Sequence, residues 1–172
     1  DWLIDALHLH RPVVVVGHSL GGPIAMTWAT SHVADTAGVV LVDAPDAGFN
    51  QWLAEVMTEA DKTEFGDPFA PASGDPEHVD STTAFGQLSR LPTLGDRPMM
   101  VLTHDPTHPD GVESAFSGVV PRDETREAWL RAQSRWTGFS DISELVTVDG
   151  TGHLIQAQDP DAVVAAILAT MP

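Results

Sequence analysis

Uninterrupted apolar runs mark the strands that the chain is expected to form. Residues 13–16 are four consecutive valines with no polar residue among them. A run of this kind is typical of a strand buried on both faces, as in the parallel sheets of α/β proteins. Residues 38–42 form a second such run, which ends at Asp43. Two further strands are predicted at residues 99–103 and 145–148.

Helices are predicted between and after these strands, because apolar residues recur three and four positions apart. The predicted helices cover residues 2–9, 20–32, 124–136 and 162–170. The last follows Asp159, Pro160 and Asp161, which together make a good helix start. Strands that alternate with helices in this order predict an α/β fold with a doubly wound, mainly parallel sheet.

Residues 46–96 interrupt this regular order. Glycines and prolines break the segment into short helical pieces, at Gly66, Pro68, Pro71, Gly74 and Pro76. We therefore expect a core formed by residues 1–45 and 97–172, with residues 46–96 inserted as a helical cap. Between Asp43 and Asp80 there are ten acidic residues and one lysine. That charge is interpreted as the solvated surface of the cap rather than as a site for a cationic partner.

Composition and charge narrow the possible functions. The 172 residues, 42% hydrophobic and 19% charged, fit one ordinary globular domain. No apolar run approaches the roughly 20 residues that cross a bilayer, so no membrane span is expected. A formal net charge of −17 argues against nucleic-acid binding. The absence of cysteine excludes thiolate catalysis and leaves the location open, with the cytoplasm slightly favoured.

The clearest chemical motif is Gly17-His18-Ser19-Leu20-Gly21, directly after the valine strand and before a helix. A strand that reverses into a helix so sharply strains its apex residue, and flanking side chains would collide, which explains glycine on both sides. Ser19 is then exposed above the end of the strand. The backbone N–H of Leu20 is expected to face a developing oxyanion at the helix N-terminus.

Two other interpretations of glycine-rich or histidine-rich segments are weaker. The motif lacks the third glycine of a dinucleotide-binding loop and the lysine of a phosphate-binding loop. His104 and His108 flank Asp105 in a way that suggests a metal site, but Pro106 and Pro109 prevent the helix that would align the two histidines. No metal and no cofactor is therefore expected.

A serine nucleophile needs a histidine base, and the base needs a carboxylate that orients it. His153 lies in a loop after the last predicted strand, at the sheet edge where Ser19 lies, and is the predicted base. The other candidates are better explained as surface or cap residues, namely His8, His10, His32 and His78. Asp43 ends the neighbouring strand and is favoured as the acid, with Asp105 as the alternative. Because the base must be neutral, activity is expected to fall at acid pH.

These segments together resemble the α/β-hydrolase superfamily in its serine-nucleophile branch. The resemblance is carried by residues 13–22, 38–45, 97–103 and 150–157. Residues 75–80, 94–98 and 152–156 are more closely similar to a group of small bacterial hydrolases. In that group a counterpart of Asp43 is usual, which supports Asp43 as the acid. Haloalkane dehalogenases and epoxide hydrolases share the fold but use an aspartate nucleophile, so Ser19 excludes them.

The resemblance covers the part of the family that begins at the nucleophile strand. The four preceding strands, and the loop that gives the second oxyanion donor, have no counterpart, so we expect a longer chain with these strands to be the better enzyme. The predicted function is hydrolysis of a small ester, lactone or thioester, although the same triad also serves amide, carbon–carbon and perhydrolase chemistry. The alternative is a non-catalytic binding or regulatory chain, or an incomplete one that needs a partner segment or second chain.

Overall fold

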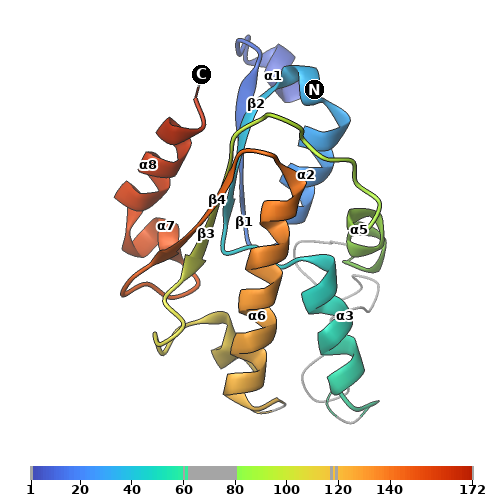
Figure 1. The fold of residues 1–172 in the computed structure, drawn as a ribbon, viewed down its shortest axis with the longest axis vertical. Coiled ribbons are helices and arrows are strands. Elements are labelled where there is room, and N and C mark those ends of the chain that lie inside the picture. Colours follow the sequence, from blue (N-terminus) through green and yellow to red (C-terminus); the bar gives the residue numbers. More distant parts are fainter. Residues whose placement is uncertain (1, 60, 62–80, 117, 119, 172) are drawn as a thin grey trace.

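The computed structural model describes residues 2–59, 61, 81–116, 118 and 120–171, and its centre is a parallel sheet (Figure 1). The sheet has the order β1 (Val13–His18), β2 (Thr36–Val42), β3 (Met99–His104) and β4 (Ser143–Val148). All neighbouring strands run parallel, with His18 beside Val42 and Val42 beside Leu102. The carboxyl ends of β1, β2 and β3 therefore lie together at the same end of the sheet.

Helices cover both faces of this sheet (Figure 1). One face packs against α2 (Gly21–Ser31), α5 (Ser81–Leu88) and the end of α6 (Arg122–Trp136). The other face packs against α7 (Ile155–Gln158) and α8 (Pro160–Ala169). The remaining described elements are α1 (Trp2–Ala6), α3 (Ala47–Val56) and the 3₁₀ helices η1 (Val33–Asp35), η2 (Val112–Phe116) and η3 (Thr137–Phe139).

Strand β2 shows why an apolar run without polar alternation forms a central strand. Val39 and Leu41 point into the core beside α2, whereas Val40 and Val42 point into the core beside α8. Every residue of β2 is buried. The α/β fold with a doubly wound parallel sheet is thus confirmed, with each predicted strand and helix present and its ends shifted by a few residues.

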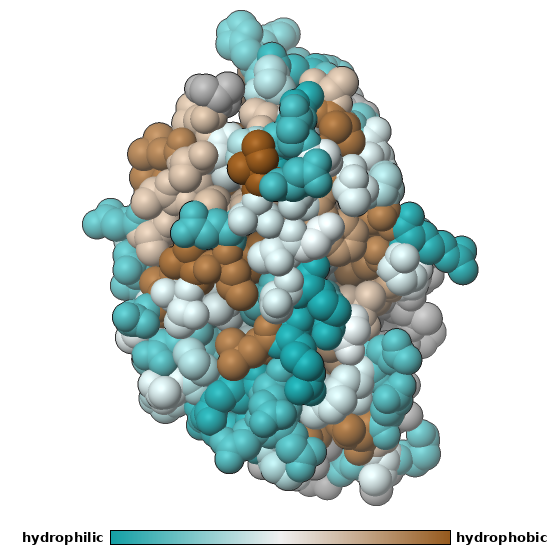
Figure 2. Space-filling view, viewed as in Figure 1, coloured by the Kyte–Doolittle hydropathy of each residue, from teal (hydrophilic) through white to brown (hydrophobic). Residues whose placement is uncertain are grey.

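Within the described residues, β1 pairs only with β2 and forms one edge of the sheet. Its exposed position is reflected in Val16, of which 43% remains accessible. Val164 and Leu168 of α8 are also more than half exposed, and Figure 2 shows apolar patches along the side of this helix. No helix in the described part of the chain has the length and apolar character needed to span a membrane.

The predicted cap, residues 46–96, lies partly outside the described residues. Helix α3 packs against α6, around Phe49 and Leu53. Helix α5 packs against α2. Residues 62–80 are outside the described part. They include the glycines and prolines expected to interrupt the cap, and His78. The division into core and cap remains a prediction.

Candidate active site

Ser19 occupies the turn between the end of β1 and the start of α2. Its φ of 51° lies in the left-handed region, which a non-glycine residue adopts only under steric strain. The turn is held on both sides, because Ser19 N donates to Val42 O at 3.0 Å and Gly22 N donates to Ser19 O at 2.9 Å. Leu20 follows as the helical N-cap of α2. The sharp strand-to-helix turn thus has the strained apex that the motif predicts.

Glycine is required at two positions around this turn, but for different contacts. A Cβ on Gly17 would lie 2.4 Å from Gly21 O, and one on Gly22 would lie 2.3 Å from the Cβ of Ala44. Gly22 therefore lets α2 pack closely on the loop after β2. A Cβ on Gly21 would meet nothing within 4 Å. The collision expected on both sides of Ser19 thus applies to Gly17 and not to Gly21.

This difference gives a matched pair of substitutions. Gly17→Ala should destabilise the protein by about 1 to 3 kcal/mol, because the clash is with backbone and cannot be relieved by a side-chain rotation. Gly21→Ala should be neutral or slightly stabilising, since alanine favours the first turn of a helix over glycine. Urea unfolding of both variants checks the ranking. Equal loss of stability would contradict the assignment of the strain to Gly17.

His153 is brought to Ser19 by the loop that follows β4. His153 N donates to Asp110 O at 2.9 Å, and His18 Nε2 donates to His153 O at 2.9 Å. Gly152 allows this approach, because a Cβ there would lie 2.6 Å from Asp110 O. The loop is therefore fixed both to the segment after β3 and to the nucleophile turn itself.

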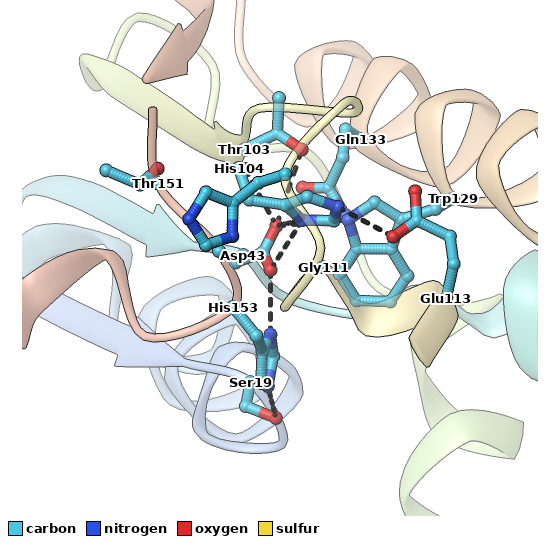
Figure 3. A network of polar contacts seen from close by, with 12 residues as sticks. Ser19, Asp43, Thr103, His104, Gly111, Glu113, Trp129, Gln133, Thr151 and His153 are labelled. Atoms are coloured by element: carbon cyan, nitrogen blue, oxygen red, sulfur yellow. Dashed lines mark hydrogen bonds and ion pairs between the residues drawn. The ribbon is translucent and has the colours of Figure 1, made fainter. Parts of the chain in front are cut away.

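Ser19, His153 and Asp43 form a continuous chain of hydrogen bonds (Figure 3). His153 Nε2 lies 3.1 Å from Ser19 Oγ, and His153 Nδ1 lies 2.7 Å from Asp43 Oδ2. Nδ1 donates to the carboxylate, which leaves the lone pair of Nε2 free to accept from the serine hydroxyl. Asp43 is fully buried, whereas His153 is partly exposed. The buried carboxylate of Asp43, the imidazole of His153 and the hydroxyl of partly exposed Ser19 thus lie in hydrogen-bonding sequence.

Asp43 is also oriented by donors other than His153. Trp129 Nε1 donates to Oδ1 at 3.0 Å and Thr103 Oγ1 donates to it at 3.3 Å. His104 adds its backbone N–H at 3.2 Å and Nδ1 at 2.9 Å. Burial alone would raise the pKa of Asp43, but the hydrogen bonds and positive charge of His104 and His153 lower that pKa to about 2. The carboxylate is therefore ionised throughout the neutral range.

Asp105 has different contacts. Its side chain accepts from Thr107 N at 2.8 Å, from Thr107 Oγ1 at 2.7 Å and from Gly150 N at 3.0 Å. The hydrogen bonds from Thr107, followed by that from Gly150, lower the pKa of Asp105 to about 2. Asp105 therefore ties the loop after β3 to the loop that carries His153. The structure brings Asp43, and not Asp105, into contact with the imidazole of His153.

The remaining histidines lie elsewhere or serve other contacts. His8 and His10 are exposed near the chain start, and His32 stacks on Trp28 at 4.7 Å between ring centroids. Nδ1 of His108 accepts from Asp110 N. Both ring nitrogens of His104 face carboxylates, Asp43 and Glu113. Sequence reasoning considered His104 only as a metal ligand, and it missed Glu113 and Trp129 as parts of the site.

Comparison with known proteins decides the family. A family model described as "Alpha/beta hydrolase family" matches residues 1–166. The chain belongs to the alpha/beta hydrolase family. No match was found among curated protein sequences.

Several solved structures share this alpha/beta hydrolase fold. Est816, described as an N-acyl homoserine lactone degrading enzyme, is 18% identical with a TM-score of 0.55, over 97% of this chain and 70% of that one. Cfl2 from Burkholderia cenocepacia is 14% identical with a TM-score of 0.57, over 99% and 68%. A metagenomic protein described among novel epoxide hydrolases from hot environments is 20% identical with a TM-score of 0.53, over 98% and 70%.

These likenesses concern the fold. The chain spans between 68% and 70% of the length of these three solved structures. An alpha/beta hydrolase fold supports hydrolase chemistry in general, while the reaction itself depends on the side chains at the site.

Proposed function

We propose that the chain acts as a serine hydrolase that cleaves an ester-type bond through an acyl-enzyme. The observation that carries the proposal is the position of His153, whose two ring nitrogens lie 3.1 Å from Ser19 Oγ and 2.7 Å from Asp43 Oδ2. A hydroxyl, an imidazole and a carboxylate in this order form the arrangement that activates serine for attack on a carbonyl.

In the first half-reaction, His153 Nε2 takes the proton of Ser19 as Oγ attacks the carbonyl carbon of the substrate. The resulting imidazolium is stabilised by ionised Asp43 through Nδ1. His153 then gives its proton to the leaving alcohol or thiol, which departs as the acyl-enzyme forms. In the second half-reaction His153 takes a proton from a water molecule as the water oxygen attacks the acyl carbon. His153 then returns that proton to Ser19 Oγ as the bond from Oγ to the acyl carbon breaks and the acid is released.

The oxyanion that forms in both steps needs hydrogen-bond donors. The backbone N–H of Leu20, first after the nucleophile and at the start of α2, is the proposed donor. The N-terminal end of the helix dipole adds a favourable field at the same place. A second donor is expected by analogy with other acyl-transfer sites.

The proposed substrate class follows from the charge of the chain. The net charge of −17 disfavours anionic substrates near the surface. We therefore propose an uncharged or cationic carboxylic ester, lactone or thioester of small to medium size. The lactone-degrading activity in the description of Est816 is compatible with this class.

Pre-steady-state kinetics with p-nitrophenyl acetate test the proposed reaction. A burst of p-nitrophenol of about one equivalent per chain should precede slower steady turnover, because acylation releases the chromophore before water cleaves the acyl-enzyme. Intact-mass analysis of the quenched burst should show one acetyl group on the chain. Slow release of p-nitrophenol, with neither an initial burst nor an acetyl group on the chain, would favour the non-catalytic alternative.

A further inference from the structure

A second histidine lies behind the acid of the proposed triad. His104 ends β3 with a side chain that is 1% exposed. Its Nδ1 is 2.9 Å from Asp43 Oδ1 and also 2.9 Å from Oδ2, and its Nε2 is 3.1 Å from Glu113 Oε2. Glu113, in η2, is likewise buried. The imidazole of His104 thus bridges two buried carboxylates (Figure 3).

This geometry fits a protonated imidazole between two ionised carboxylates. Burial would raise the pKa of Glu113, but the hydrogen bond and charge of His104 and the charge of Arg126 lower it below its usual range, which favours the ionised form of Glu113. A neutral imidazole has one N–H and one lone pair, so one of its two carboxylate partners would face a lone pair. A protonated ring donates to both. Burial opposes the charge, but the hydrogen bonds and negative charges of Asp43 and Glu113 raise the pKa of His104 to about 9.

Among the residues that the structure describes, three side chains from other elements face His104. Asp43 approaches from the end of β2, Glu113 from η2 and Trp129 from α6, with ring centroids of Trp129 and His104 6.2 Å apart. Arg126 of α6 lies beyond Glu113, with Nε 3.7 Å from Oε1.

The loop between β3 and η2 leaves room for the bridge at Gly111. A Cβ on Gly111 would lie 2.2 Å from Glu113 Oε2 and 2.7 Å from His104 Nε2. Even the smallest side chain would therefore push the two groups apart. The bridge is a closely fitted part of the site, and its place next to Asp43 connects it to the proposed chemistry.

We propose that His104 is a positioning residue, held as an imidazolium between Asp43 and Glu113, that orients Asp43 and sets the pH at which the hydrolase gains activity. This inference rests on the proposed function, since the pH effect acts through His153. With His104 charged, Asp43, His104 and Glu113 together carry one negative charge. Without that charge they carry two, which favours protonated His153 and so keeps the base inactive to higher pH.

His104→Asn tests the effect of charge, because asparagine keeps a donor side chain and removes the cation. The midpoint of the acid limb of kcat/KM should move up by about one pH unit. Adding Glu113→Gln removes the second carboxylate charge, so the double variant H104N/E113Q should return part of the way toward the wild-type midpoint. Thr103→Val removes a neutral hydrogen bond to Asp43 and should move the midpoint by less than about 0.2 units.

Contrary results are equally specific. A loss of activity in His104→Asn with an unmoved acid limb would overturn the inference, as would a shift to lower pH or an equal shift in Thr103→Val. The double variant also guards against simple misfolding, because it removes the second buried carboxylate charge.

A measurement without turnover separates this inference from the proposed function. Ring ¹⁵N NMR of assigned His104, in wild type and in Ser19→Ala, should show both nitrogens protonated at pH 7.5. A neutral ring would overturn the inference even if Ser19 proves to be the nucleophile. A doubly protonated ring in a protein without hydrolase activity would refute the proposed function and leave the charge of His104 established.

Stability at alkaline pH gives a second independent readout. The pKa of His104 is higher in the folded state, so its contribution is fully present below about 6.5 and is lost as the pH rises through about 9. The chain has no tyrosine or cysteine and a single lysine, so few other groups titrate there. The urea midpoint should fall between pH 7 and 10 in wild type and stay level in H104N/E113Q. Parallel curves for the two proteins would contradict a charged His104.

Discussion

Ser19→Ala should reduce kcat for p-nitrophenyl acetate by about 10⁴ to 10⁶-fold. The substitution removes the proposed nucleophile, whereas substrate binding and oxyanion stabilisation leave a small residual rate. Alanine adds no bulk at a position that already accepts a side chain at a φ of 51°. The loss should therefore be in kcat and should appear without any large change in the unfolding midpoint.

The matched control is Ser134→Ala, an exposed serine in α6. It should retain wild-type turnover, which separates the loss of one hydroxyl at the site from a general effect of serine removal. Undiminished hydrolysis by Ser19→Ala, with the fold intact by circular dichroism, would rule out the proposed mechanism.

Asp43→Asn should reduce kcat by about 10⁴-fold, the second largest expected effect. Asparagine has nearly the shape of aspartate but presents an amide that favours the wrong tautomer of His153. It also lacks the negative charge that stabilises the imidazolium as the proton is transferred. Steady-state kinetics with a short p-nitrophenyl ester measure the loss, and fluorescence confirms that the tryptophan environment is retained.

Asp105→Asn provides the comparison with Asp43→Asn, because both aspartates lie at the carboxyl end of the same sheet. Its side chain accepts from Thr107 and Gly150, so the substitution loosens two loops without touching the imidazole. We expect less than about a tenfold loss in kcat, equivalent to a barrier increase below about 1.4 kcal/mol. If Asp105→Asn were the more damaging substitution, the role of the acid would pass from Asp43 to Asp105.

Much of the fold could be predicted from local patterns. The valine run and the run ending at Val42 predicted parallel strands because no polar residue interrupts them, and the buried strand β2 has this character throughout. The turn at Ser19 could be predicted because the motif stands between a strand and a helix. Parallel strands end at one edge, which explains why Ser19 and Asp43 could be expected near one another.

Other features depend on contacts that no local pattern records. The choice between Asp43 and Asp105 depended on the path of a loop rich in proline and histidine, and only the structure shows which carboxylate reaches His153. The bridge from His104 to Glu113 depends on the turn at Gly111, and no local pattern indicated it. The sequence offered only a metal site for His104, together with His108, and that interpretation was rejected because of Pro106 and Pro109. The sequence also could not show that a Cβ on Gly21 would point into open space, because the direction of that bond is set by the folded turn.

Labelling with a fluorophosphonate probe is the most direct test of Ser19 as an activated nucleophile. Such a probe forms a stable bond with a serine only where a base activates the hydroxyl. Peptide mass mapping of the labelled protein should find a single adduct, on the peptide that contains Ser19, and labelling should be lost in Ser19→Ala. An adduct on another residue, or an unlabelled protein that is fully folded at neutral pH, would contradict the account.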